Sequence, residues 1–285
     1  MTDVDERPIV VGVDGSEAGL EAADWAADEA VRHGRRLRLV CAMTWDPYEA
    51  VTPPVTAGSG GSEEAAQEIL AEASERVAAR QPTVDVTTEV SLGEPVTTLT
   101  AEAREAYLVV TGSRGRGPLT RMLLGTVSLG VAARASCPVV VVRGEPENRQ
   151  GRFGRIVVGV DAEEHAATAV GFAFREAEVR DVPLTAVHAW RAGHTGAGGG
   201  AGPPDAADVF GGVVADAAAV HAGVRLHRET IEGSPRQVLL RQAETADLLI
   251  VGAHHRRGVV GLRLGLLSHA LLHHSPCPVA VVPQP

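Results

Sequence analysis

The amino-acid sequence predicts an α/β protein built from two tandem copies of one domain, each a five-stranded parallel sheet covered by helices. Three observations carry this prediction. Several segments of the first half recur in the second half. Short apolar runs alternate with helical patterns in each half, which is typical of βαβ units. Hydrophobic residues make up 45% of the sequence and aromatic residues 3%, a balance that favours small side chains packed between helices and a parallel sheet.

The repeat defines the domain organisation. Residues 9–14 read IVVGVD and recur at residues 156–161, and residues 136–142 read SCPVVVV and recur as PCPVAVV at residues 276–282. We therefore expect one domain at residues 1–147 and a second at residues 152–285. The segment from Gly144 to Gly151 is polar and carries glycine and proline, so it is predicted to link the two domains.

Five strands are expected in each domain, separated by turn residues and helices. They lie near Ile9–Val13, Leu37–Met43, Val84–Val90, Tyr107–Thr111 and Val139–Val142 in the first copy, and near Ile156, Leu184, Val224, Leu248 and Val279 in the second. The helix after the first strand of each copy has apolar residues three and four positions apart, which predicts one buried stripe. These residues are Leu20, Ala23, Ala27 and Val31 in the first copy, and Ala166, Ala169, Val170, Ala173, Phe174 and Ala177 in the second. The loops at residues 53–62 and 193–204 are rich in glycine and proline and are expected to be mobile.

Composition excludes several classes of partner. The formal net charge of −10 disfavours nucleic acid and anionic membrane surfaces. No segment reaches the roughly 20 uncharged apolar residues of a membrane span, and residues 1–7 are acidic and polar rather than signal-like. The three cysteines, Cys41, Cys137 and Cys277, are widely spaced, as in proteins of reducing compartments. We therefore expect a cytoplasmic protein with no nucleic-acid or membrane partner.

One motif carries the functional prediction, and it follows the fourth strand of the first copy. It reads Gly112-x2-Gly115-x9-Gly125-Thr126. Glycines let main-chain N–H groups approach a polyphosphate, and a helix that opens at Thr126 adds a hydroxyl and the positive end of its dipole. Asp14, at the end of the first strand, is placed to accept a hydrogen bond from a ribose hydroxyl or to help hold Mg²⁺. The motif predicts a phosphate-binding loop.

Plainer explanations stay open for the same residues. The glycines can serve as turn and packing residues, and Asp14 can simply cap the helix that follows it, as Ser16 is well suited to do. Three arginines of the loop either clamp phosphate or form a solvated surface: Arg114, Arg116 and Arg121.

Histidines and cysteines offer further candidate sites. His269 and His273 are four residues apart on a predicted helix and could share a metal ion, although no carboxylate or cysteine stands at a matching spacing. Cys137 and Cys277 each precede a proline at the start of a strand, where packing explains them better than redox chemistry.

The chain resembles the universal stress proteins in their tandem two-domain form. The resemblance covers nearly the whole chain and rests on the VGVDGS start at residues 11–16, the glycine loop, and CPVVVV at residues 137–142. It implies an adenine-nucleotide-binding, Rossmann-like sandwich related to the adenine nucleotide alpha hydrolases, with strand order 3-2-1-4-5. It also implies pairing through the last strand, as a homodimer or as a pseudo-dimer of the two domains, and a role in stress or dormancy signalling.

The resemblance also implies roles for individual residues of the first copy, which would bind ATP with or without Mg²⁺. By position, Asp14 contacts ribose and adenine, and Ala42 binds the adenine ring through its backbone. Gly112 and Gly115 form the turn at the ribose and phosphate, and the terminal phosphate is bound by Gly125, Thr126, Val127 and Ser128. Gly15 and Ser16 complete the predicted set.

The second copy departs from this pattern at the predicted site. His255 replaces Gly115, Leu266 replaces Thr126, and Ala162-Glu163-Glu164 stands where the first copy has Gly15-Ser16. An imidazole crowds the backbone approach, a leucine removes a hydroxyl, and carboxylates repel a polyanion. Asp161, Gly252, Gly265 and Ser268 are retained. The second site is therefore expected to be weak or empty, which predicts about one ATP per chain.

Three functions are compatible with these patterns. The favoured one is a regulatory protein whose ATP occupancy biases domain pairing or partner docking. A slow ATP hydrolase is a second, although the sequence has no G-x4-G-K-[S/T] loop and no general base placed by a motif. A dimerising scaffold that binds no nucleotide is the third. We expect a binding protein rather than an enzyme.

Overall fold

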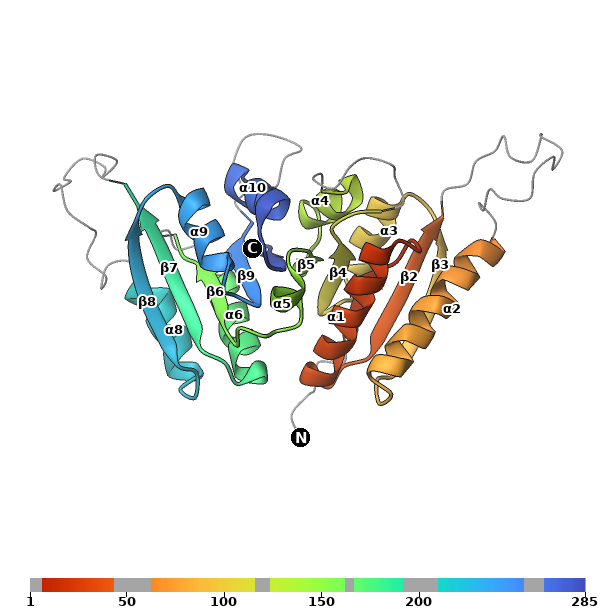
Figure 1. The fold of residues 1–285 in the computed structure, drawn as a ribbon, viewed down its shortest axis with the longest axis horizontal. Coiled ribbons are helices and arrows are strands. Elements are labelled where there is room, and N and C mark those ends of the chain that lie inside the picture. The colour runs from red at the N-terminus through yellow and green to blue at the C-terminus, as the bar shows by residue number, and fades with distance from the viewer. Residues whose placement is uncertain are drawn as a thin grey trace. The chain divides into compact units, whose positions relative to one another are not determined.

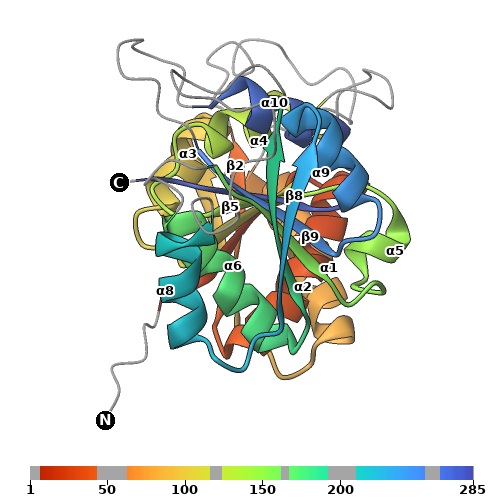
Figure 2. The same ribbon diagram turned by 90° about the vertical axis from the view of Figure 1, so that its left-hand side faces the viewer.

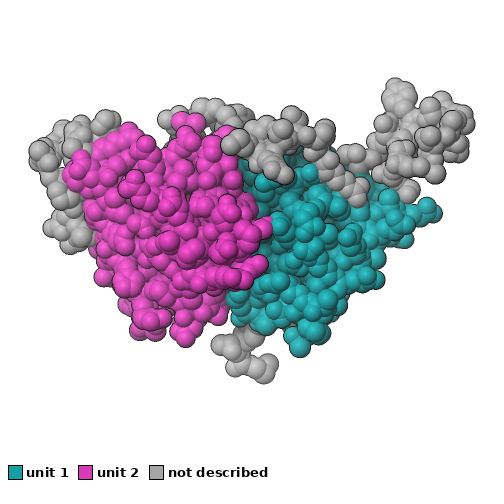
Figure 3. All heavy atoms as spheres, in the orientation of Figure 1, with its two compact units in different colours: residues 1–142 teal, residues 143–285 magenta. Residues whose placement is uncertain are grey.

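The computed structural model describes residues 7–43, 63–115, 124–161, 167–191, 210–253 and 264–284. The chain divides into two compact units, residues 1–142 and residues 143–285, which Figure 3 shows in separate colours. The loops expected at residues 53–62 and 193–204 fall outside the described residues. So do Arg116, Arg121, Ala162, Glu163, Glu164, Ala166, His254 and His255.

Unit 1 holds a parallel sheet whose strands lie in the order β3-β2-β1-β4-β5 (Figure 1). The strands are β1 (Ile9–Gly12), β2 (Leu37–Met43), β3 (Val86–Leu92), β4 (Leu108–Gly112) and β5 (Val139–Val142). The order matches the expected one and reverses between β1 and β4. In open parallel sheets, ligands bind at such a reversal, beyond the carboxyl ends of the strands.

Helices cover both faces of this sheet (Figure 1). On one face lie α1 (Glu17–His33) and α2 (Glu63–Arg80), and on the other lie α3 (Pro95–Glu102) and α4 (Thr126–Ala132). The apolar stripe predicted for α1 is buried at its first three positions. Val31, the fourth, is 44% exposed and lies one residue beyond Ala30, the last buried residue of the helix.

Unit 2 repeats the arrangement, with its strands in the order β8-β7-β6-β9-β10. The strands are β6 (Ile156–Gly159), β7 (Leu184–Trp190), β8 (Leu226–Glu232), β9 (Leu248–Gly252) and β10 (Val279–Val282). Figure 2 shows α6 (Ala167–Arg180) and α8 (Gly212–Val220) on one face of the sheet and α9 (Pro235–Ala243) on the other, where α10 (Leu266–His274) packs against α9. The described part of the predicted α6 stripe, from Ala169 to Ala177, is buried.

The central strands are runs of buried aliphatic residues, as expected for a sheet covered on both faces. The third strand of each unit begins two residues later than predicted. In unit 1 the N–H of Val84 donates to the carbonyl of Gln81, and in unit 2 the N–H of Val224 donates to that of His221. Both residues are therefore held in the turn that precedes the strand. Among the described residues, no helix combines the length and the apolar character that a bilayer crossing needs.

The predicted linker is instead a packed part of unit 2. Residues Pro146–Arg149 form the short helix α5, and the side chain of Asn148 is buried. Its amide donates to the carbonyls of Ala243 and Ala246, at 3.2 and 2.7 Å. Polar composition suggested an exposed link, but this polar side chain is used to satisfy carbonyl groups at the end of α9.

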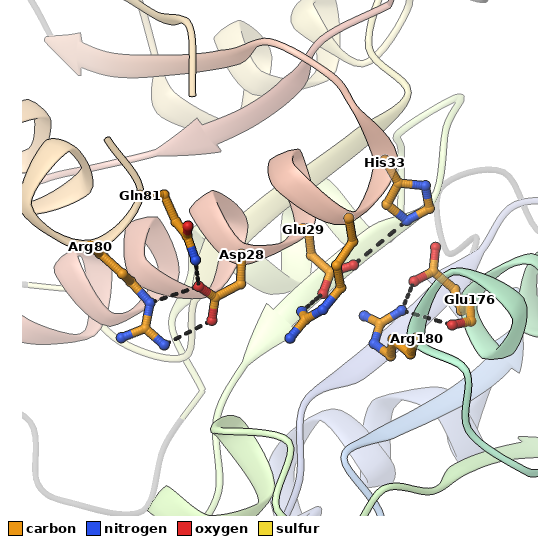
Figure 4. A network of polar contacts seen from close by, with 8 residues as sticks. Asp28, Glu29, His33, Arg80, Gln81, Glu176 and Arg180 are labelled. Atoms are coloured by element: carbon orange, nitrogen blue, oxygen red, sulfur yellow. Dashed lines mark hydrogen bonds and ion pairs between the residues drawn. The ribbon is translucent and has the colours of Figure 1, made fainter. Parts of the chain in front are cut away.

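An ion pair between Asp28 and Arg80 joins α1 to α2 in unit 1, and others lie within single helices of each unit (Figure 4). In unit 1 the carboxylate of Asp28 on α1 accepts hydrogen bonds from Arg80 at 2.7 and 2.9 Å and from Gln81 at 2.8 Å. Burial raises the pKa of Asp28, but these bonds and the nearby arginine charges lower it by more. Two buried glutamates at equivalent helix positions also contact basic side chains of their own unit: Glu29 contacts Arg32 and His33, and Glu176 contacts Arg180.

At Gly112 the backbone of α1 packs directly against the sheet. A Cβ at this position would lie 2.4 Å from the carbonyl oxygen of Ala18, which belongs to the helix backbone and cannot turn aside. Gly112→Ala is therefore expected to lower the free energy of unfolding by about 2–3 kcal/mol, as overpacking of a rigid contact does. Chemical denaturation of both proteins measures this difference, and equal midpoints would show that α1 can shift freely.

Candidate nucleotide-binding cleft

A cleft of about 450 Å³ opens at the carboxyl edge of the unit 1 sheet, where the strand order reverses. All the predicted binding residues except Gly15 and Ser16 line it. The lining consists of Gly12, Val13, Asp14, Gly19, Val40, Ala42, Pro95, Leu99, Thr111, Gly112, Arg114, Gly115, Leu124, Gly125, Thr126, Val127 and Ser128. The fold thus brings the end of β1, the end of β4 and the start of α4 around one hollow.

Asp14 is held in place by the turn that leads into α1. Its Oδ1 accepts a hydrogen bond from the N–H of Ser16 at 3.0 Å and from the Ser16 hydroxyl at 2.6 Å. Gly15 has a φ of +73°, which favours glycine in this turn. Ser16 is the N-cap, because its oxygen accepts from the N–H of Gly19 at 3.2 Å. The capping role predicted for Ser16 is therefore confirmed, and Gly15 and Ser16 support Asp14 from outside the cleft.

The three motif glycines differ in what surrounds the place where a Cβ would lie. At Gly112 the space is taken by α1, as described above. At Gly115 a Cβ would lie 2.6 Å from Oδ2 of Asp14, so this glycine lets the loop approach the carboxylate. At Gly125 a Cβ would meet nothing closer than 3.7 Å. The protein itself therefore leaves room for a β-carbon at Gly125, a residue that lines the cleft.

The first turn of α4 presents main-chain donors to the cleft. Gly125 is the N-cap, and no side chain of the described residues caps this helix. The N–H of Gly125 donates to the carbonyl of Ser113 at 2.9 Å, and the Ser128 hydroxyl donates to the carbonyl of Gly112 at 2.6 Å. Both donors are thus used inside the protein. The N–H groups of Thr126, Val127 and Ser128 are the first-turn donors that an α-helix leaves unbonded within itself.

Several lining residues were not predicted from the sequence. Pro95 and Leu99 come from α3, and a Cβ at Gly12 would lie 2.7 Å from Cδ1 of Leu99, so α3 packs directly over the end of β1. The recurrence of Gly93-Glu-Pro95 as Gly233-Ser-Pro235 was the available signal, because it marks the start of α3 in both copies. Thr111 carried no signal of its own.

The equivalent cleft of unit 2 is much smaller, at about 110 Å³. Three positions differ in character or size: Val251 stands for Thr111, the larger Leu267 stands for Val127, and Leu266, which stands for Thr126, is 83% exposed. The side-chain amide of Gln284 lies against Gly252, only 2.5 Å from where a Cβ would be. Unit 2 therefore keeps the architecture of the site with much less of its volume.

The alternative sites are less developed. The rings of His269 and His273 lie 4.5 Å apart on α10, but no third metal ligand joins them among the described residues. Burial, and then the charge of His269, lowers the pKa of His273. Burial also raises the pKa of Cys137 and of Cys277 to about 12, so both thiols are neutral near pH 7 and suited to packing.

Together, the repeated parallel sheet and the cleft at its switch point define a tandem α/β protein with a cleft at the same place in each domain. The sequence profile of the universal stress protein family matches residues 6–143 and again residues 152–283. A universal stress protein of Mycobacterium tuberculosis is 33% identical over 293 residues, with 98% of each chain covered. One from Mycolicibacterium smegmatis is 31% identical, with 97% of each chain covered. The chain belongs to the universal stress protein family.

Solved structures agree with this fold. A universal stress protein from Archaeoglobus fulgidus superposes with a TM-score of 0.75 at 19% identity, covering 98% of both chains. A protein of unknown function from Pseudomonas aeruginosa superposes with a TM-score of 0.62 at 16% identity, covering all of this chain and 95% of the other. At these identities the likeness concerns the fold alone.

Proposed function

We propose that this chain is an ATP-binding regulatory protein that holds the nucleotide in the cleft of unit 1. The observation that carries the proposal is the meeting of a held carboxylate, Asp14, with an uncapped helix start at Gly125 in one hollow. The volume of about 450 Å³ supports it, because pockets for small ligands and cofactors typically measure about 300–1,000 Å³.

Each end of the nucleotide has a matching part of the cleft in this proposal. The N–H groups of residues 126–128, the Thr126 hydroxyl and the Arg114 charge bind the phosphates, since helix starts and guanidinium groups favour anions. Asp14 accepts from the ribose, and the backbone of Ala42 on β2 binds the base. If Mg²⁺ accompanies ATP, Asp14 is the carboxylate that lines the described cleft, and one carboxylate with phosphate oxygens suits this ion.

Binding rather than turnover is the function we propose. A hydrolase needs a group that activates water, and in this proposal Asp14, the carboxylate among the described lining residues, is engaged by the ribose or by Mg²⁺. Regulation follows if ATP binds one arrangement of the domains, or of two paired chains, more tightly than another. We place the protein in the cytoplasm. A nucleotide-free scaffold and a slow hydrolase are the competing functions.

Calorimetric titration of the purified full chain with ATP, ADP and AMP, with and without Mg²⁺, tests the proposal. We expect saturable ATP binding and turnover below about 1 per minute, far under the enzyme median of about 10 per second. Absence of binding to any of the three nucleotides would favour the scaffold. Faster release of phosphate would favour the hydrolase.

A further inference from the structure

The hydroxyl of Thr111 is an unusual feature of the unit 1 cleft. Thr111 is only 3% exposed, and its hydroxyl oxygen has no hydrogen-bond partner among the described residues. A buried hydroxyl without a partner is destabilising, and most such groups in proteins find one. Thr111 is also one of the residues that line the cleft. The residue that carries this hydroxyl therefore borders the space in which we place the nucleotide.

The register of the sheet fixes the face on which Thr111 lies. Thr111 on β4 is paired with Gly12 on β1 in a parallel ladder, so both residues point to the same face. A Cβ at Gly12 would contact Leu99 of α3. Thr111 thus lies on the α3 and α4 side of the sheet, whereas Gly112, the next residue, faces α1.

The second unit shows that the fold does not need this hydroxyl. Val251 holds the same place on β9, in a cleft of the same construction, and valine has the shape of threonine with a methyl in place of the hydroxyl. The polar atom is therefore specific to the larger cleft. Thr100 on α3 also has an enclosed hydroxyl with no partner among the described residues, but it does not line the cleft.

We propose that Thr111 is a specificity-determining residue whose hydroxyl hydrogen-bonds to a sugar hydroxyl of the bound nucleotide. The inference rests on the proposed function and on the strand order β2-β1-β4. With the base at Ala42 on β2 and the phosphates at α4, the sugar lies over β1 and β4, where Thr111 is. Rotation about the Cα–Cβ bond carries the hydroxyl of threonine from one staggered position to another, so the hydroxyl can turn toward the sugar without a change in backbone.

The test compares Thr111→Val with the matched control Thr100→Val, using ATP, 2′-deoxy-ATP and 3′-deoxy-ATP in calorimetric titrations. Thr111→Val is expected to weaken ATP binding about fivefold to tenfold, the effect of one hydrogen bond, while Thr100→Val leaves it unchanged. In the wild type both deoxynucleotides bind more weakly than ATP, because Asp14 is the proposed partner of one sugar hydroxyl and Thr111 of the other. In Thr111→Val one of these two penalties disappears, because that sugar hydroxyl has already lost its partner, and the penalty that depends on Asp14 stays.

Thermal denaturation without nucleotide supplies an independent readout. Neither variant is expected to lower the melting temperature, since neither hydroxyl has a described partner to lose. Equal ATP affinity in wild type and Thr111→Val would overturn the inference and leave the proposed function standing. Weaker binding with unchanged discrimination among the three nucleotides would also overturn it. A wild type that binds no nucleotide would refute the proposed function itself, and this inference with it.

Discussion

Replacing Gly125 by alanine is expected to weaken ATP binding at least about 100-fold while changing the free energy of unfolding by no more than about 1 kcal/mol. The added Cβ meets no protein atom closer than 3.7 Å, so the fold accommodates it, and only a modest cost at an N-cap remains. Because Gly125 is the N-cap of α4 and lines the cleft, we expect the same Cβ to hinder the approach of a phosphate to the N–H groups of residues 126–128. Hydrogen bonds to charged groups contribute about 1.5–3 kcal/mol each, so displacing a phosphate from two of them accounts for the loss.

Calorimetry with ATP and chemical denaturation, performed on the same preparations, measure both effects. Gly223→Ala is the matched control, because a Cβ there meets nothing within 4 Å and the residue belongs to unit 2 and does not line the cleft. Gly115→Ala is a useful companion, since its Cβ would push against Oδ2 of Asp14 and disturb the carboxylate directly. Undiminished ATP affinity in Gly125→Ala would mean that the phosphates do not lie at the start of α4.

The fold was largely predictable from the sequence because its signals are local and repeated. The recurrence of IVVGVD marks β1 and β6, and the alternation of apolar runs with helical patterns indicates a parallel sheet. The same is true of the cleft residues that belong to a glycine motif or end a strand, such as Asp14, Gly115 and Gly125. A motif fixes how many residues separate its members, and the carboxyl ends of parallel strands lie at one edge of the sheet. Residues that follow these strands therefore come together at that edge.

Other features depend on contacts between distant segments and were missed. Residues 144–151 look like a linker by composition, but the amide of Asn148 meets carbonyl groups about a hundred positions further along the chain. The sequence does not reveal that the Ser128 hydroxyl is taken up by Gly112, or that Leu99 packs over Gly12. The difference between Gly112 as a packing residue and Gly125 as an open position is likewise a property of the assembled unit.

The asymmetry of the two clefts was expected from the sequence, although partly for other reasons. Two of the substitutions that suggested it, at Glu163 and His255, lie outside the described residues. The described part of unit 2 supplies its own reasons: Leu266 and Leu267 follow Gly265, and Gln284 covers Gly252. The hydrogen bond from Ser268 to the Gly252 carbonyl measures 3.3 Å, against 2.6 Å for its counterpart in unit 1.

The chain is therefore expected to bind one ATP, with any second site at least about 100-fold weaker than the first. A volume of about 110 Å³ lies below the range of about 300–1,000 Å³ that is typical of ligand pockets. A nucleotide therefore enters unit 2 only if Gln284 and neighbouring groups move. The free energy of that rearrangement weakens binding. Native mass spectrometry across a range of ATP concentrations counts the bound nucleotides directly.

Counting bound nucleotides in the Gly125→Ala variant shows which unit holds the nucleotide. If unit 1 holds the single nucleotide, this substitution removes all binding at concentrations that saturate the wild type, whereas Leu266→Thr in unit 2 leaves one nucleotide bound. Two nucleotides of equal affinity in the wild type, or one nucleotide that persists in Gly125→Ala, would place a competent site in unit 2. The small cleft of unit 2 would then have to open on binding, and the volumes of the two clefts would no longer distinguish a binding domain from its inactive copy.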